Sequence, residues 1–329
     1  MNMCRRVTRL QSSGPMPLAV FGSDHACRAG STEDDARGLG VLQPLGRVYR
    51  VNRSEDGRRS EAELERIARE IRVKSVLAAR GKGQAYIGQA LQSAELLSCL
   101  FFDELRWGPD LVDDDSRDRF LLSVGHYALA FYGMLAARGM LTDEQLGGYG
   151  QDGNMLTLGA EPGLVPGVEF AGGSLGQGLG VASGLAWGLS YRKNTARVFN
   201  YMSDGEIQEG STWEAAMFAG DRGLSNLTTI VDVNRTQADG KLVLEIEPLA
   251  KKFESFGWWT TEVDGNDIRE VLGAFAEARR VDDDRPRAVI AHTRLGHGSP
   301  TIQGRPNAHF VRVGADEWDA VANEVEESE

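Results

Sequence analysis

The stretch RVFNYMSDGEIQEG (residues 197–210) begins with an apolar run rich in aromatic residues and ends in an acidic, glycine-flanked turn. Such a run predicts a β-strand, and the WEAAMFAG that follows (213–220) has the spacing of a helix. Similar apolar runs are LTTIVDV (227–233), WWTTEV (258–263) and RAVIAHT (287–293). Because these short strands alternate with helical patterns, the sequence predicts an α/β fold with a parallel sheet covered by helices on both faces.

The amino-terminal part of the chain has a different composition. Residues 1–58 mix Gly, Ser, Arg and Asp with little periodicity, which predicts a disordered extension. Order is expected to begin at Ser60, because Ser60 and Glu63 can form a capping box and a helical pattern starts at Leu64. Helical patterns are expected to dominate from there to about residue 190, and residues 59–329 are expected to form the folded domain.

Composition and charge argue against several classes of protein. The 329 residues carry a formal net charge of −12, which disfavours binding to a nucleic-acid backbone. Cys4, Cys27 and Cys99 are too few and too scattered for a disulfide framework or a zinc site, and we expect reduced thiols. The apolar run MPLAVF (16–21) is too short for a signal peptide or a membrane span. We therefore expect a soluble, cytoplasmic protein.

Polar residues follow two of the predicted strands. Asp204 and Gly205 come after the first strand, and Asn234 ends the next one. Ligands of parallel sheets bind at the carboxyl ends of the strands, and Mg²⁺ prefers oxygen ligands that it shares with phosphates. Gly205 would let a phosphate approach the backbone. The same spacing is equally compatible with Asp204 as a helix cap and Asn234 as a turn residue.

A resemblance to a known family extends this interpretation. SDGEIQEGSTWEAAMFAG (203–220) followed by NLTTIVDVNRTQADG (226–240) resembles the thiamine diphosphate and magnesium motif of transketolases. The resemblance covers about residues 60–310 and continues through SVGHYALAFYGMLAARG (123–139), PGVEFAGGSLGQGLGVASGLA (166–186), PLAKKFESFGWWTTEVDGND (248–267) and VIAHTRLGHGSP (289–300). It implies the thiamine diphosphate-binding fold, with residues 59–329 as the domain that holds the diphosphate.

The resemblance also implies a role for each matching residue. Asp204 and Asn234 would bind Mg²⁺ together with the carbonyl of Thr236, and Gly205 would lie against the diphosphate. His126 and His309 would reach the diphosphate or the reacting centre.

Four further residues match the family. Gly173 and Leu175 would line the rings of the cofactor, although Leu175 is also compatible with plain helix packing. Glu209 and Glu214 would belong to a carboxylate network that links paired active sites across a dimer interface, with solvated helix charges as the alternative.

The chain departs from the family where transketolases handle sugars. Tyr86 and Gln89 stand where the family has His and Gly, Ser203 replaces the first Gly of the magnesium motif, and a second His is missing from TLGAEPGLVPGVE (157–169). A phenol, which titrates near pH 10, cannot replace imidazole as a base at about neutral pH. We therefore expect cofactor chemistry on an unusual substrate, with Tyr86 either donating a hydrogen bond to a carbonyl or filling space.

Two other histidines carry weaker signals. His292 lies in a predicted buried strand and is expected to be a core histidine. His297, in GHG at the end of that strand, is a candidate site residue.

The resemblance implies a partner. Thiamine catalysis needs a Glu at the aminopyrimidine, and transketolases carry it on a second, pyrimidine-binding domain. Because the sequence ends at Glu329, soon after the first domain, we expect the amino-terminal subunit of a split transketolase. Its partner would be a carboxy-terminal, pyrimidine-binding subunit in an α2β2 heterotetramer.

The expected reaction is transfer of a two-carbon ketol unit from a donor to an acceptor. One alternative is decarboxylation of a 2-oxo acid followed by acyl or ketol transfer in a specialised biosynthetic pathway, and another is a non-catalytic partner subunit. A nicotinamide oxidoreductase is disfavoured, because GGSLGQG (172–178) lacks a convincing strand before it.

Overall fold

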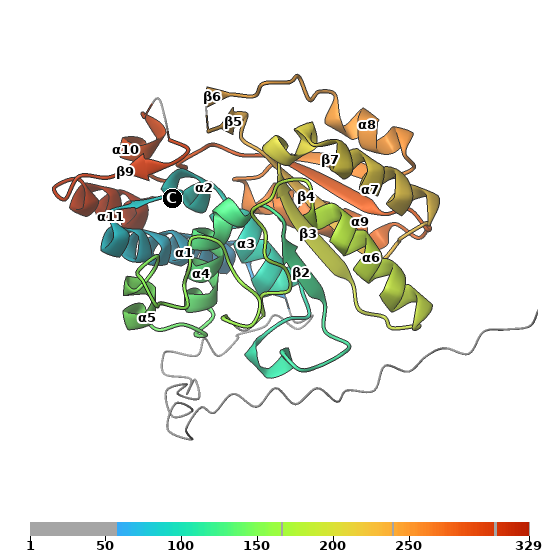
Figure 1. Ribbon diagram of the computed structural model, residues 1–329, viewed down its shortest axis with the longest axis horizontal. Helices are drawn as coiled ribbons and strands as arrows, with labels where there is room; N and C mark the ends of the chain where they lie inside the picture. The colour runs from blue at the N-terminus through green and yellow to red at the C-terminus, as the bar shows by residue number, and fades with distance from the viewer. Residues whose placement is uncertain (1–57, 166, 239, 306–307, 329) are drawn as a thin grey trace, which may run out of the picture. The chain divides into compact units, whose positions relative to one another are not determined.

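The computed structural model describes residues 58–165, 167–238, 240–305 and 308–328 (Figure 1). The predicted disordered extension, with Cys4 and Cys27, lies outside the described residues except for Arg58. Cys99 is described, and it is a buried free thiol as predicted.

The centre of the domain is a five-stranded parallel sheet with the strand order β2-β3-β4-β8-β7. Its strands are β2 (Arg119–Leu122), β3 (Val198–Ser203), β4 (Leu227–Val233), β7 (Trp259–Asp264) and β8 (Arg287–His292). Each of the four predicted strands is confirmed to within one residue at either end. The central strands β3 and β4 are buried along their whole length, as expected for a sheet covered on both faces.

Helices cover both faces of this sheet (Figure 1). Alternate residues of β3 point to opposite sides, so that Phe199 and Tyr201 pack into one apolar cluster and Val198 and Met202 into the other. The second cluster includes α6 (Gly178–Tyr191), α7 (Gly210–Asp221) and α8 (Leu249–Ser255). The first includes α1 (Glu61–Lys82), α3 (Ala94–Cys99), α4 (Ala128–Ala137) and α9 (Ile268–Arg280). The predicted α/β architecture is confirmed.

Small elements outside the sheet bring distant parts of the chain together. The remaining helices are α2 (Ile87–Gln92), α5 (Asp143–Gly147), α10 (Pro300–Gln303) and α11 (Trp318–Glu327). The remaining strands are β1 (Gln84–Ala85), β5 (Thr236–Gln237), β6 (Gly240–Lys241) and β9 (Val311–Arg312). Strand β1 pairs antiparallel with β9, and this pairing brings Tyr86 close to residues 309 and 310.

The first helix begins where the sequence predicts. The Ser60 hydroxyl accepts a hydrogen bond from the Glu63 N–H at 3.3 Å, and the Glu63 carboxylate accepts one from the Ser60 N–H at 3.3 Å. Two of the N–H groups at this helix start are thereby satisfied.

Helices dominate from Ser60 to about residue 190 as predicted, apart from the short strands β1 and β2 and one long segment without regular structure. Strand β2 forms the edge of the sheet, and residues 148–177 contain no helix or strand among those described. Strand β2 was missed because its four residues stand between a charged loop and the helical pattern of α4, too short to show their own period.

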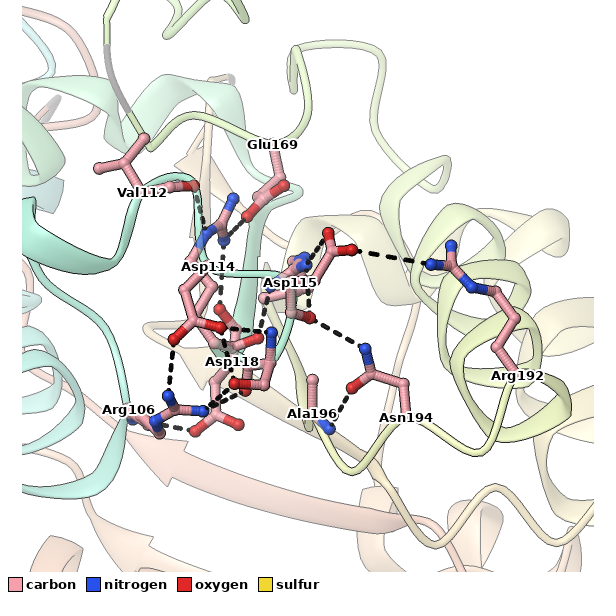
Figure 2. A network of polar contacts seen from close by, with 12 residues as sticks. Arg106, Val112, Asp114, Asp115, Asp118, Glu169, Arg192, Asn194 and Ala196 are labelled. Atoms are coloured by element: carbon pink, nitrogen blue, oxygen red, sulfur yellow. Dashed lines mark hydrogen bonds and ion pairs between the residues drawn. The ribbon is translucent and has the colours of Figure 1, made fainter.

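A polar network holds the loop that leads into β2 (Figure 2). Arg106 donates to the Asp114 carboxylate at 2.7 Å, and the Arg106 N–H donates to Asp118 at 2.9 Å. The Asn194 amide donates to the Asp115 carbonyl at 2.9 Å. Arginine side chains and main-chain or amide groups thus bind Asp114, Asp115 and Asp118. These contacts explain the cluster of acidic residues before β2 as a structural feature.

Two further observations bear on the sequence predictions. His292 is not a core histidine: its side chain is 38% exposed and its Nε2 lies 3.1 Å from the Glu262 carboxylate. His292 is the last residue of β8 and is half-buried, whereas the five residues before it in the strand are buried. Within the described residues, no helix is both long enough and apolar enough to cross a membrane.

Candidate functional site

A cavity of about 330 Å³ lies beyond the carboxyl ends of β3 and β4. Its lining residues are Tyr86, Gln89, Val124, His126, Tyr127, Leu175, Ser203, Asp204, Gly205, Gln208, Glu209, Asn234, Thr236, Gln237, Ala238 and His309. We call Asp204, Asn234 and Thr236 its carboxylate side, and Tyr86, His126 and His309 its aromatic side. Ligands are expected at this edge of a parallel sheet.

Asp204 lies at the end of β3 and is 1% exposed. Its carboxylate accepts a hydrogen bond from the Arg235 N–H at 2.6 Å. Burial raises the pKa of Asp204 to about 7, although main-chain N–H groups, that of Arg235 foremost, act in the opposite direction. The alternative role of Asp204 as a helix cap is not observed, since Ser203 caps the short 3₁₀ turn Asp204–Gln208.

Ser203 replaces a glycine of the family motif without strain. Its φ of −103° is ordinary for any residue, and its N–H donates to the Glu206 carboxylate at 3.3 Å. Serine is therefore accommodated at this position.

Asn234 follows β4 in a tight turn. Its Oδ1 accepts a hydrogen bond from the Thr236 N–H at 2.8 Å, so part of its expected turn function is present. Arg235 between them has φ of +58°, a left-handed conformation that is uncommon for a residue with a side chain. This conformation aims the Arg235 N–H at Asp204 and ties the ends of β3 and β4 together.

The charges around the cavity suit a divalent cation. Among its described lining residues there is no Lys or Arg, and no described cationic side chain forms an ion pair with Asp204. A buried carboxylate without a cation is costly, and a dication beside it would favour its ionised form. One carboxylate, an amide and a main-chain carbonyl fit Mg²⁺, which usually takes few protein ligands and completes its shell with phosphate and water oxygens.

On the aromatic side, the rings of Tyr86, His126 and His309 form a triangle in which each contacts the other two. The Tyr86 ring centroid lies 4.8 Å from that of His126 and 5.5 Å from that of His309, and both contacts are edge-to-face. Phe310 packs against the same ring at 4.8 Å. The Tyr86 ring is thus packed against three other rings, and no hydrogen bond of its hydroxyl is found among the described residues.

Gln89, the second departure from the family, contacts His309. The Gln89 Nε2 lies 2.8 Å from the His309 Nδ1, while the Gln89 Oε1 is buried without a partner among the described residues. With Nε2 as the donor, His309 accepts at Nδ1 and carries its proton on Nε2. This contact leaves Nε2 as the ring nitrogen of His309 that is available to a ligand.

Burial sets the protonation of the aromatic side. Burial lowers the pKa of His126. It also lowers the pKa of His309, and repulsion from the nearby His126 acts in the same direction. Burial raises the pKa of the Tyr86 phenol. At neutral pH all three side chains are therefore uncharged, and they can recognise a ligand through hydrogen bonds and ring contacts.

Close backbone contacts fix the loop that borders the cavity. A Cβ at Gly125 or Gly172 would come closer than 3.0 Å to main-chain atoms of the opposite segment, and a Cβ at Gly178 would collide with Ser123. The buried Glu206 carboxylate accepts from the Gly176 N–H at 2.9 Å and from the Ser123 hydroxyl. The loop is thus held against the ends of β2 and β3.

The cavity brings together most of the residues predicted from the sequence. Gly173 and Glu214 do not line it, and Glu214 is exposed on α7. Glu209 lines the cavity but is also exposed at its rim. His297 lies elsewhere, with its Nε2 3.8 Å from the Glu95 carboxylate.

Sequence reasoning missed three buried residues beneath the carboxylate side. These are Gln92, Tyr127 and Asp232, which form a hydrogen-bonded network below Asn234. The only signal was a carboxylate within the apolar run LTTIVDV, two residues before Asn234 and therefore on the same face of the strand.

The described domain matches known proteins closely. Residues 64–326 match the family model "Transketolase, thiamine diphosphate binding domain". An uncharacterised transketolase family protein of Sinorhizobium fredii is 44% identical over 253 residues, covering 76% of this chain and 91% of that protein. An apulose-4-phosphate transketolase subunit of Actinobacillus succinogenes is 35% identical, covering 80% of this chain and 96% of that subunit.

Two further comparisons concern a sulfosugar relative and a solved structure. The 6-deoxy-6-sulfo-D-fructose transketolase subunit of a Clostridium species is 32% identical, covering 74% of this chain and 89% of that subunit. The transketolase structure from Leishmania mexicana is similar with a TM-score of 0.73 at 27% identity; the match covers 82% of this chain and only 41% of that one. The resemblance noted from the sequence is confirmed: the chain belongs to the transketolase family, of which it carries the thiamine diphosphate-binding domain.

Proposed function

We propose that this chain is the diphosphate-holding subunit of a magnesium- and thiamine diphosphate-dependent enzyme that transfers a two-carbon ketol unit. The single observation that carries the proposal is the buried Asp204 beside Asn234 in a cavity lined by no described Lys or Arg. A diphosphate can bind beside that carboxylate only if a cation joins them, because the two anions otherwise repel each other.

The residues of the carboxylate side would hold the metal. Asp204 supplies the charged oxygen, Asn234 an amide oxygen and Thr236 its main-chain carbonyl, while Gly205 leaves the backbone open to the diphosphate. When bound, thiamine diphosphate supplies the carbon nucleophile that breaks and forms carbon–carbon bonds beside a carbonyl group.

The aromatic side would orient the substrate and handle protons. His309, with its proton on Nε2, donates a hydrogen bond to an oxygen in the cavity, and His126 can donate or accept because its ring is neutral. The Tyr86 hydroxyl adds a further donor. Since no described cation lines the cavity, an anionic group on the substrate would have to be recognised by the partner.

A separate pyrimidine-binding subunit is part of the proposal. Two relatives that this chain covers over 89% and 96% of their length are named as subunits of transketolases. On this chain, α6 turns an apolar face outward with Val181, Trp187 and Tyr191 exposed by 47%, 51% and 87%. Open space lies beside its glycines, Gly180, Gly184 and Gly188. Such a face suits close packing against another protein, and we propose an α2β2 heterotetramer.

Co-expression with a candidate pyrimidine-binding chain from the same organism tests the proposal. We expect light scattering to give the mass of an α2β2 complex, and calorimetry to give thiamine diphosphate binding that EDTA abolishes and Mg²⁺ restores. Turnover with ketose donors should require both chains. Cofactor binding unaffected by EDTA would contradict the metal assignment, and full turnover by this chain alone would contradict the split enzyme.

A further inference from the structure

The amide of Asn234 has a defined orientation. Its Nδ2 donates to the Tyr127 hydroxyl oxygen at 3.1 Å and to the Gln92 Oε1 at 3.3 Å. Its Oδ1 accepts from the Thr236 N–H at 2.8 Å. The nitrogen is therefore turned toward the protein interior, and the oxygen is the end that remains for a ligand.

This orientation can be traced to the buried carboxylate of Asp232, which is 0% exposed. Asp232 accepts from the Gln92 Nε2 at 3.0 and 3.1 Å and from the Tyr201 hydroxyl at 2.8 Å. It also accepts a hydrogen bond from the Thr293 hydroxyl. The Gln92 amide therefore turns its nitrogen toward Asp232, which leaves the Gln92 oxygen on its other side.

The donors and acceptors then follow in order. The Tyr127 hydroxyl oxygen faces Asn234 and accepts a hydrogen bond from its Nδ2. The Gln92 amide directs its nitrogen to Asp232 and to the Tyr127 oxygen at 2.9 Å, so its own oxygen also faces Asn234. A flipped Asn234 would place its oxygen against the Gln92 Oε1 and its nitrogen against the Thr236 N–H, a costly arrangement in a partly buried site.

We infer that Tyr127 and Gln92 are positioning residues for the metal: through Asp232 they present the Oδ1 of Asn234, and not its Nδ2, to the cation. The inference rests on the proposed function, because it assigns buried support to the proposed metal site. A hard cation takes oxygen ligands, so an amide held the wrong way would be lost as a ligand. Neither Tyr127 nor Gln92 needs to touch the cofactor for this role.

The chain offers a matched control. Tyr201 is as buried as Tyr127 and donates to the same Asp232 carboxylate, but it has no contact with Asn234 among the described residues. Tyr127→Phe and Tyr201→Phe each remove one buried hydroxyl next to Asp232. A general loss of stability should therefore appear in both variants, whereas a misplaced Asn234 should appear in only one.

The test titrates Mg²⁺ and thiamine diphosphate separately, by calorimetry, into the full chain in complex with its pyrimidine-binding partner. We expect Tyr127→Phe and Gln92→Leu to weaken the apparent Mg²⁺ affinity by about tenfold, the usual cost of removing a residue that orients a metal ligand. At saturating Mg²⁺ the affinity for thiamine diphosphate should return to within about twofold of wild type. Tyr201→Phe should leave both constants near wild type while lowering the melting temperature as much as Tyr127→Phe does.

Each other outcome has a distinct meaning. If the wild-type complex shows no Mg²⁺-dependent cofactor binding, the proposed function is overturned and this inference with it. If the wild type binds but Tyr127→Phe and Tyr201→Phe have the same Mg²⁺ affinity, the positioning role is wrong while the proposed function stands.

Discussion

The carboxylate side and the aromatic side of the cavity are assembled from the chain in contrasting ways. Asp204 and Asn234 follow two adjacent parallel strands, so the register of β3 and β4 alone brings them to one edge. Tyr86, His126 and His309 come from three distant segments, which meet through the small β1–β9 pairing and through side-chain contacts. The first arrangement depends on the sheet, and the second depends on the side chains themselves.

This difference suggests where the chain can change its chemistry. Substitution of Asp204 or Asn234 alters a ligand set that has no spare carboxylate, whereas Tyr86 and Gln89 already differ from the family and both contact His309. We therefore expect changes on the carboxylate side to affect cofactor binding, and changes on the aromatic side to affect turnover and substrate preference.

The largest effect is expected for Asp204→Ala. Removing the only anionic ligand of the proposed metal should weaken Mg²⁺-dependent binding of thiamine diphosphate by about 100-fold or more. Calorimetry of the complex measures this, and Asp221→Ala, an exposed carboxylate on the same strand–helix unit, is the control. Wild-type affinity in Asp204→Ala would contradict the assignment of the carboxylate side to metal and cofactor binding.

Gln89→Leu should separate the two sides. It removes the hydrogen bond to the His309 Nδ1 with little change in volume, so His309 should lose its fixed tautomer and turnover should fall by about tenfold. Cofactor affinity should stay within about threefold of wild type, because Gln89 contacts His309 on the aromatic side and has no hydrogen bond to the carboxylate side among the described residues. Nitrogen NMR of the histidine ring reports the tautomer, and an unchanged spectrum would show that Gln89 does not hold it.

Tyr86→His tests the substrate-facing position. The imidazole should change the ratio of kcat/KM values between donor ketoses by about 3- to 30-fold, because one hydrogen bond is exchanged for another. Tyr86→Phe separates the hydroxyl from the ring, and it should preserve cofactor affinity. A severe loss of cofactor binding in Tyr86→His, with substrate preference unchanged, would show that Tyr86 serves cofactor binding and does not face the substrate.

The smallest effect concerns pH. Because burial lowers the pKa of His126 and His309 below the ordinary value of 6.5, the unfolded chain binds protons more tightly at these residues than the folded chain does. Their contribution to stability is complete above pH 6.5 and is lost as the pH falls through the folded pKa values. NMR titration should give midpoints below 6.5, and a His126→Gln, His309→Gln variant should lose less stability on acidification than the wild type. Midpoints above the ordinary value would contradict this.

The sequence was informative wherever a short-range pattern determines the structure. The strand β4 was predicted with its observed ends, and the cap of α1 was predicted from Ser60 and Glu63 alone. Strand β2 was missed because four residues carry too little pattern. The contact between Gln89 and His309 joins residues 220 positions apart, and no local spacing could indicate it.

The glycines at the border of the cavity have a practical consequence for protein engineering. A combinatorial library that randomises Gly125, Gly172 and Gly178 would consist largely of unfolded members, since any side chain there meets neighbouring atoms at less than 3.0 Å. Positions 86 and 89 already accept bulky residues, and their neighbours are rings and amides that can rearrange. A library made to find new donor substrates should randomise Tyr86 and Gln89 and keep the three glycines constant.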